Sequence, residues 1–254
     1  MSTTTPIRPG LGSGLRLARA EVVITRRLLN EMWKVTRWLW PAGVLVAVIV
    51  GIAISSVSPI TQSIWENAGQ WPRWWLFAMA IALVATHLPV AVLHGVTRRA
   101  AIRAVTLSGV LVSMAWAAFM VCGHVVEQFI YDRLGWPDVL DTPHLFRDGY
   151  DVLPMFAEYT LIFLAYVISG GLIGGFYYRF GWFRGTLLIP GGLLPAVAIE
   201  GLLSTGWYGA GLQQGLSVSR PSAPVLVVAS IVVLSLAWQV LYLVLRDVQI
   251  ANKK

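Results

Sequence analysis

Long runs of apolar residues, separated by short polar segments, dominate the pattern along this chain. Six runs hold about 20 residues with few or no charges, which is the length that crosses a hydrocarbon layer about 30 Å thick. The predicted spans are residues 38–58, 74–96, 104–126, 159–178, 185–203 and 224–245. Prolines and glycines interrupt the fifth run, so we expect that span to be kinked or partly re-entrant. The pattern predicts an all-α fold, a polytopic membrane bundle of six transmembrane helices.

The segment before the first span predicts a helix of a different kind. Residues 15–37 place apolar side chains three and four positions apart among basic residues, as on one face of a helix. We expect an N-terminal amphipathic interfacial helix that either anchors to anionic lipid or docks a partner. The polar residues 1–13 predict a disordered cytoplasmic tail and no cleaved signal peptide, which leaves residues 14–254 as a single transmembrane domain.

Composition supports the membrane class and narrows the candidate partners. Hydrophobic residues make up 57% of the chain and charged residues only 12%, about half the charged share of a soluble domain. The net charge of +7 does not predict nucleic-acid binding, because no soluble stretch is long enough to form a recognition module. The single cysteine, Cys122, lies in an apolar run, so we expect neither a disulfide within the chain nor a cysteine-based metal site.

The distribution of basic residues predicts the orientation. Of the 19 lysines and arginines, four fall in segments on the side opposite the N-terminus: Arg73, Arg133, Arg147 and Arg220. Basic residues concentrate in cytoplasmic segments of membrane proteins. We therefore expect a multi-pass protein of the plasma membrane with both termini in the cytoplasm.

Ionisable residues at the far ends of three spans form a candidate polar site. His124 and Glu127 are three residues apart near the end of the third span, Glu158 precedes the fourth, and Glu200 lies in the outer third of the fifth. Acidic groups inside a membrane are costly and often functional. Two interpretations stay open: a translocation or proton-coupling site, or side chains that extend to the outer interface.

Glycines in the fourth span predict close helix packing. Gly170, Gly171, Gly174 and Gly175 form overlapping Gly-x-x-x-Gly pairs, which allow a close contact within one protomer or between two. They do not predict a phosphate-binding loop, because the only lysines are Lys34, Lys253 and Lys254 and none follows a glycine-rich turn. We also find no catalytic motif, so we expect no catalytic residue, no metal and no enzyme activity in this chain.

The turn between the second and third spans has a sequence that resembles a known family. This turn reads Leu93-His94-Gly95-Val96-Thr97-Arg98-Arg99-Ala100-Ala101-Ile102-Arg103. Such a basic turn, reached after an amphipathic helix and two spans, resembles the permease subunits of type-two ABC exporters. Residues 174–182 and Gly185 are similar to a segment of actinobacterial members. The acidic loop after the third span is longer than in that family, and the fifth span is richer in proline and glycine.

The resemblance implies a mechanism and a set of partners. Six spans would form half of a dimeric pore with a second permease copy or paralogue. A separate ATPase dimer would bind ATP and Mg²⁺, so this chain would hold no cofactor. The ATPase-coupling loop would contain Gly95, Thr97, Arg98, Arg99 and Arg103, although these arginines also fit a purely topological role.

Polar groups near the middle of the spans bear on the substrate. They are few, which favours an amphipathic, lipid-like or peptide or antibiotic substrate that slides between apolar surfaces. The competing hypothesis is an ATP-independent secondary transporter or a membrane scaffold subunit. A secondary transporter would need a polar site near the middle of the membrane, so the scarcity of such groups favours the permease.

Overall fold

The computed structural model describes residues 11–57, 60, 62–93, 97–137, 140, 142–206, 209 and 220–246, and all regular structure in these ranges is helical. The helices are α1 (Leu11–Val57), α2 (Ile64–Ala68), α3 (Gln70–Leu93), α4 (Arg98–Leu134), α5 (Val152–Leu187), α6 (Ile189–Leu203) and α8 (Ala223–Arg246). Four of them, α1 from Val22 onward, α4, α5 and α8, are long and apolar enough to cross a membrane. The prediction of an all-helical membrane fold is confirmed at this level.

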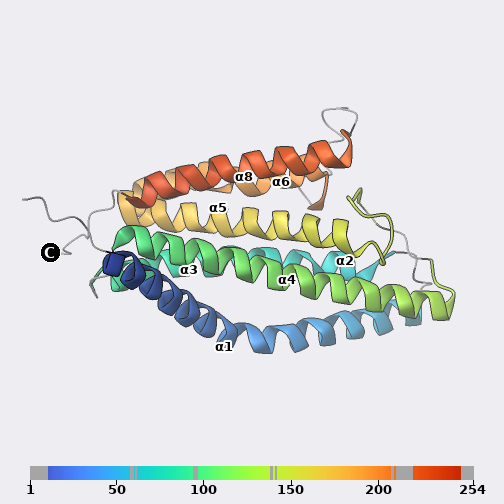
Figure 1. Cartoon of the computed structure of the whole chain (residues 1–254). Helices are drawn as coiled ribbons and strands as arrows, with labels where there is room; N and C mark the ends of the chain where they lie inside the picture. Colours follow the sequence, from blue (N-terminus) through green and yellow to red (C-terminus); the bar gives the residue numbers. More distant parts are fainter. Residues whose placement is uncertain are drawn as a thin grey trace, which may run out of the picture.

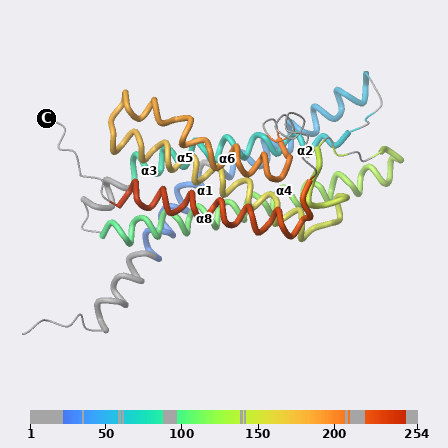
Figure 2. The backbone as a smooth tube through the Cα atoms, turned by 90° about the horizontal axis from the view of Figure 1, so that it is seen from above, coloured from blue at the N-terminus to red at the C-terminus, as the bar shows by residue number. Residues whose placement is uncertain are grey.

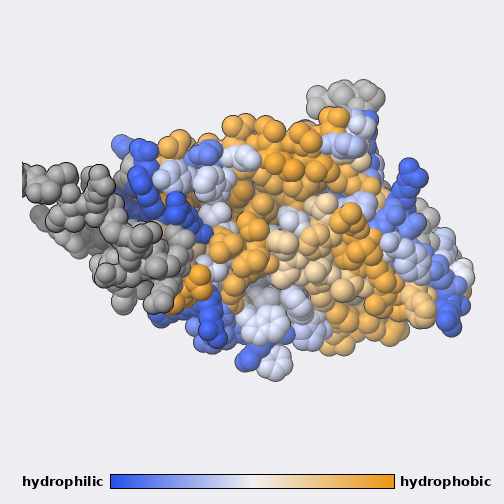
Figure 3. Space-filling model, in the orientation of Figure 1, coloured by the Kyte–Doolittle hydropathy of each residue, from blue (hydrophilic) through white to orange (hydrophobic). Residues whose placement is uncertain are grey.

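The long helices lie side by side along one direction, which gives the bundle two ends (Figure 1). We call the basic end the one where α4 begins at Arg98 and α8 ends at Arg246. The polar end is the opposite one, where α2 lies and α4 ends at Leu134. An apolar belt covers the middle of the visible face, and hydrophilic residues gather toward both ends (Figure 3). This distribution is the one expected of a bundle surrounded by lipid.

Helix α5 is the centre of the packing and contacts α3, α4, α6 and α8. The glycines predicted to pack closely lie on this helix. A Cβ atom at Gly170 or Gly174 would approach the carbonyl oxygens of Phe77 or Ile81 on α3, and one at Gly171 would contact Leu241 on α8. Gly175 faces the end of α8 in the same way. The glycines therefore bring α5 close to two neighbouring helices of the same chain.

Helix α1 joins the predicted interfacial helix and the first predicted span without a break. In its first part Leu28 and Met32 pack against Leu83 of α3, and from Val22 onward the helix runs obliquely to the other helices (Figure 2). Its second part leaves a long series of apolar side chains exposed, including Val44, Leu45, Val46, Val48, Ile49, Ile52 and Val57. That surface is available to lipid or to a second copy. Residues 1–10 of the predicted tail lie outside the described residues.

The fifth predicted span, residues 185–203, begins in the last turn of α5 and continues as α6. The chain bends at Gly181, whose φ of 76° is in the left-handed region that favours glycine. Helix α6 then has Pro190 in its first turn, where a missing N–H has no cost, and Pro195 inside. At 15 residues, α6 is about 22 Å long, shorter than the four helices that are long and apolar enough to cross a membrane.

Candidate functional site

The four carboxyl and imidazole groups predicted at the far ends of the spans all lie at the polar end, inside the bundle. His124, Glu158 and Glu200 are buried and Glu127 is nearly so. The structure adds three buried residues to them, Glu66, Arg73 and His144. We call these seven residues the polar cluster. Its members come from α2, α3, α4, α5, α6 and the segment before α5, so it connects most of the elements at this end.

Glu127 of α4 holds the start of α2. Its carboxylate accepts hydrogen bonds from the Ser63 hydroxyl at 2.6 Å and from the backbone N–H groups of Ile64 and Trp65 at 2.8 and 2.9 Å. On the other side, His124 Nδ1 lies 3.8 Å from Glu127 Oε2, and His124 Nε2 lies 2.8 Å from the Tyr159 hydroxyl of α5. The pair predicted to meet across one helical turn thus connects three helices.

Glu158 of α5 and Glu66 of α2 share one imidazole. His144 Nδ1 lies 2.5 Å from Glu158 Oε1, and Nε2 lies 3.0 Å from Glu66 Oε1. The Leu145 N–H donates to the second oxygen of Glu158, and the Thr142 hydroxyl and N–H both donate to Glu66. These bonds fix the segment before α5 against the ends of two helices.

The protonation of His144 follows from its position between two carboxylates. Burial alone lowers the pKa of His144, but the hydrogen bonds and charges of Glu158 and Glu66 outweigh it and raise that pKa from 6.5 to about 9. At neutral pH the ring is therefore an imidazolium that donates from both nitrogens. The result is a buried triad in which one imidazole ring lies between two carboxyl groups.

Glu200 of α6 is paired with a residue far away in the sequence. Its Oε1 accepts a hydrogen bond from Arg73 Nη1 at 2.6 Å and one from the Tyr166 hydroxyl at 2.8 Å. The Arg73 and Glu200 side chains are only 4% and 1% exposed. Arg73, counted in the sequence among the basic residues of the outer segments, is in fact part of the buried core.

The polar cluster is arranged as a structural clamp. Each of its carboxylates receives hydrogen bonds or an ion pair from the protein itself, so burial of its charge is compensated. Glu158 and Glu200 are both buried within the protein and accept hydrogen bonds from it. Within the described residues, no group of three or more His, Cys, Asp or Glu side chains is arranged to hold a metal ion.

Sequence reasoning missed Glu66, Arg73 and His144 because each lies outside the predicted spans or at the edge of one. The only signal was the position of His144 in the acidic loop, close to several carboxylates. Nothing local to Glu66 or Arg73 indicates a partner.

The predicted coupling turn lies at the basic end, at the start of α4. Thr97 is the N-cap: its hydroxyl accepts a hydrogen bond from the Ala100 N–H at 3.4 Å. Arg98 and Arg99 follow in the first turn, which contains no acidic residue, and Arg103 lies about one turn further along. Gly95, the remaining residue predicted for this turn, lies outside the described residues.

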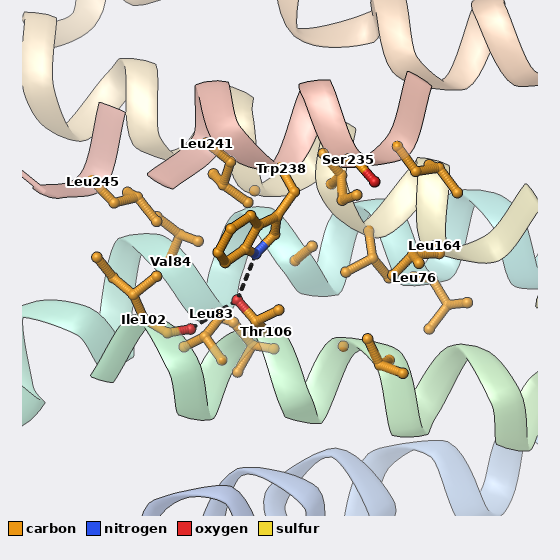
Figure 4. A pocket seen from close by; sticks show the side chains of 18 of the residues that line it. Leu76, Leu83, Val84, Ile102, Thr106, Leu164, Ser235, Trp238, Leu241 and Leu245 are labelled. Atoms are coloured by element: carbon orange, nitrogen blue, oxygen red, sulfur yellow. Dashed lines mark hydrogen bonds between the residues drawn. The ribbon is translucent and has the colours of Figure 1, made fainter. Parts of the chain in front are cut away.

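A cavity of about 510 Å³ lies between α3, α4, α5 and α8. Apolar side chains make up most of its wall, including Leu76, Leu83, Val84, Ile102, Leu164, Leu241 and Leu245 (Figure 4). The Trp238 indole extends from α8 toward α4, and its N–H donates to the Thr106 hydroxyl at 3.1 Å. The volume is within the range of about 300–1,000 Å³ typical of small-molecule sites.

Comparison of the chain with protein-family models, with characterised proteins and with solved structures finds no match. Functional conclusions for this chain therefore depend on its residues and their geometry.

Proposed function

We propose that this chain is the transmembrane permease subunit of an ATP-driven exporter of the ABC type. It would pair with a second permease copy or paralogue and be powered by a separate ATPase dimer that binds ATP and Mg²⁺. The observation that carries the proposal is the basic start of α4, where Arg98 and Arg99 occupy a first turn that contains no acidic residue. This is the turn whose sequence resembles the coupling loop of such permeases.

Basic residues at a helix N-terminus are unfavourable within the isolated chain. The N-terminus of a helix carries a partial positive charge of roughly half an elementary charge, so acidic residues are stabilising there and basic residues are not. An acidic surface on another protein would relieve this repulsion. The placement of Arg98 and Arg99 therefore supports a docking role on the side from which the ATPase would approach.

Helix α4 could transmit a displacement of this turn through the bundle. It has 37 residues and is about 55 Å long, and it packs against α1, α3 and α5. Near its other end, Glu127 holds α2 by three hydrogen bonds. In the proposed mechanism, closure of the ATPase moves Thr97 and the arginines that follow it. The stiff helix then carries that movement to the polar end, and the bundle changes between two arrangements.

The proposed topology has six crossings, by α1, α3, α4, α5, α6 and α8. The basic end would face the cytoplasm together with both termini, in the plasma membrane, because most lysines and arginines belong to the segments on that side. The first part of α1 would serve as the interfacial helix. Helix α6, the shortest of the six, would cross only with help from the bent segment that follows Gly181.

The apolar cavity supports an amphipathic, lipid-like or peptide substrate over a strongly polar one. Its wall offers few hydrogen-bonding groups, and burying a polar molecule there without partners would cost free energy. The carboxylates of the polar cluster support the same choice, because their pairing within the protein leaves them poorly suited to bind a moving ion.

The test is affinity purification of the tagged protein from its native membrane in mild detergent, with co-purifying proteins identified by mass spectrometry. We expect a stoichiometric ATPase that is lost when Arg98→Glu and Arg99→Glu are combined. The control is Arg184→Glu, which reverses an exposed charge near the same end but away from the turn and should keep the ATPase bound. ATP hydrolysis by the eluate provides the second readout.

A folded, monodisperse preparation without any ATPase would contradict the proposal. That result would favour the competing class, an ATP-independent carrier or a membrane scaffold. Retention of the ATPase by the doubly reversed variant would contradict the assignment of the turn while leaving the permease function in place.

A further inference from the structure

The chain between the bend in α5 and the start of α6 forms a hook at the basic end. We call residues 181–188, which begin at the bent Gly181, the hook. Just before the bend, Arg179 Nη1 donates to the backbone carbonyl oxygens of Leu243 and Val244 at 3.0 and 3.2 Å. Both acceptors lie near the end of α8. The hook therefore begins at the basic end, close to the last turn of α8.

One side of the hook is fixed against the end of the helix that precedes it. The Tyr177 and Thr186 hydroxyl groups lie 3.0 Å apart, and the Thr186 hydroxyl lies within 2.9 Å of the Trp182 carbonyl oxygen. A Cβ atom at Gly185 would lie 2.9 Å from the Tyr177 ring, so this close approach requires glycine. These contacts give the hook a defined shape.

The hook presents large apolar side chains and one arginine outward. Trp182, Phe183 and Leu187 are 79%, 67% and 66% exposed. Arg184 is exposed as well, and its side chain forms no hydrogen bond or ion pair with any other described residue. An exposed apolar patch of this kind indicates contact with a membrane or with another protein.

The mixture of side chains decides between these surroundings. Water does not suit three exposed apolar groups, and the hydrocarbon centre of a bilayer does not suit an arginine. The membrane interface suits both, because tryptophan rings gather at head-group depth and the arginine stem can lie along apolar groups while its guanidinium stays in the polar layer. An unpaired guanidinium at that depth is complementary in charge to an anionic phospholipid.

We propose that the hook is an interfacial anchor that binds anionic phospholipid. Trp182, Phe183 and Leu187 lie among the outermost methylene groups of the leaflet at the basic end, and Arg184 binds the phosphate of a head group. The anchor does not depend on transport and holds equally for a permease, a carrier or a scaffold.

The depth of the hook is measured on the purified full-length protein in vesicles of phosphatidylcholine and phosphatidylglycerol. Cys122→Ser removes the only native cysteine, and Leu187→Cys carries an environment-sensitive fluorophore. The quenchers are lipids with a nitroxide near the head group, lipids with a nitroxide near the chain end, and iodide in the water. We expect the head-group nitroxide to quench about threefold more strongly than either of the others, as at an interface.

Labels at Val48 and Asp148 calibrate the measurement. Val48 is exposed on the apolar second part of α1, and Asp148 is exposed in the segment before α5. The chain-end nitroxide should quench the first best, and iodide the second. A Leu187 label that matches Asp148 would overturn the anchor and leave a protein partner as the cover of the hook. One that matches Val48 would overturn the interfacial depth.

The contribution of Trp182 is tested with the same label at Leu187. Trp182→Ser removes the ring but keeps the carbonyl oxygen beside the Thr186 hydroxyl, so the shape of the hook is retained. Iodide quenching should rise about twofold, and Trp182→Phe should keep most of the protection. The matched control is Leu153→Ser, a similarly exposed apolar residue at the opposite end of α5, which should change nothing. Equal effects of the two serine variants would contradict the anchor.

The contribution of Arg184 is tested by comparing nitroxide-labelled phosphatidylglycerol with nitroxide-labelled phosphatidylcholine as quenchers. We expect phosphatidylglycerol to be enriched around the hook. Arg184→Gln should lower this enrichment by up to about fivefold, which is the contribution of one basic residue near an anionic surface. Arg184→Lys should keep most of it. The control is Arg99→Gln, which removes an exposed arginine of the same end outside the hook and should leave the enrichment unchanged.

Two outcomes of the charge test would overturn the lipid contact of Arg184. Equal losses in Arg184→Gln and Arg99→Gln would show a general surface potential instead of a contact at the hook. Equal quenching of the unmodified hook by the two lipids would show no preference for an anionic head group. Size-exclusion profiles and far-ultraviolet circular dichroism confirm that each variant is folded before its quenching is measured.

Discussion

Charged side chains have opposite surroundings at the two ends of the bundle. At the polar end, Arg73 and His144 are buried and paired with carboxylates of the same chain. At the basic end, Arg98 and Arg99 begin α4 in a first turn that contains no acidic residue, and Arg99 borders a recess open to the surroundings. Sequence inspection counted Arg73 only as a topological charge, and it left Arg98 and Arg99 with either a coupling or a topological role.

The two arrangements have different physical consequences. A buried charge that the protein satisfies itself holds helices in place and has little capacity left for a ligand. A positive side chain in the first turn of a helix is unfavourable within the chain itself, because the helix dipole places a partial positive charge there. The polar end thus has buried charges that are paired within the chain, whereas Arg99 at the basic end is exposed, and substitutions at each end test what these arrangements do.

The largest expected effect comes from breaking the Arg73–Glu200 pair. Glu200→Gln or Arg73→Met should each lower the free energy of unfolding by about 3–5 kcal/mol, because a buried charge is left without its partner. The double variant Arg73→Met with Glu200→Leu should recover much of this loss, since no charge is then buried. Chemical unfolding in detergent measures all three. Single variants as stable as the unmodified protein would show that the polar end is not a clamp.

The second prediction concerns pH and the triad around His144. The pKa of His144 in the folded protein, about 9, is above its ordinary value of 6.5, so the protonated ring stabilises the fold. That contribution, up to about 3 kcal/mol, is complete below pH 6.5 and disappears as pH rises through about 9.

The control variant for the triad is His144→Gln. The unmodified protein should lose stability between pH 7 and pH 9.5 by more than the variant does, as measured by unfolding midpoints at each pH. Parallel pH curves for the two proteins would count against an imidazolium at this position. The difference between them also removes the contribution of tyrosines and lysines that titrate in the same range.

The third prediction is a smaller loss of stability, and it concerns the packed middle of the bundle between the two ends. Gly170→Ala places a methyl group against the Phe77 carbonyl oxygen and should cost about 1–3 kcal/mol by overpacking. Gly191→Ala is the matched control, because a Cβ atom there meets nothing within 4 Å and alanine is the better helix former. Thermal unfolding of both variants should give shifts of opposite sign or a shift for Gly170→Ala alone.

The smallest expected effect is a gain in stability rather than a loss, and it concerns the basic end. Arg98→Glu should raise the stability of the isolated chain by about 0.3–1 kcal/mol, because an acidic residue suits the first turn of a helix. The same substitution, combined with Arg99→Glu, should release the proposed ATPase. A stabilised chain that has lost its partner would show that the basic turn is retained for recognition at a cost in stability. Destabilisation by Arg98→Glu would instead indicate an internal partner for Arg98.

Particular residues show where sequence reasoning succeeds in this protein. The apolar runs locate α3, α4, α5 and α8, because the apolar stretch of a span is a matter of local composition, although α4 and α5 extend six to nine residues beyond the predicted spans at each end. The glycine spacing places Gly170 and Gly174 on one face, which is the face that meets α3. The sequence also locates His124 and Glu127 on neighbouring turns of one helix, a relation fixed by 3.6 residues per turn.

The same reasoning fails for pairs that are distant along the chain. Arg73 and Glu200 are 127 residues apart, and His144 and Glu66 are 78 apart. Local periodicity states which face of a helix is polar but not which other helix that face meets. The continuity of α1 from Leu11 to Val57 was missed for a related reason: the change from amphipathic to fully apolar composition reads as a boundary, although the backbone continues through it.

By itself, the sequence determined that this is a helical membrane protein with a basic turn between two of its apolar segments. Helix length, hydropathy and charge distribution are properties of consecutive residues, and they need no knowledge of the fold. Only the tertiary structure decided which charged side chains are buried and paired within the protein, such as Arg73 with Glu200. It also created the cavity between α4 and α8, because a space between helices depends on the crossing of faces that are far apart in the sequence.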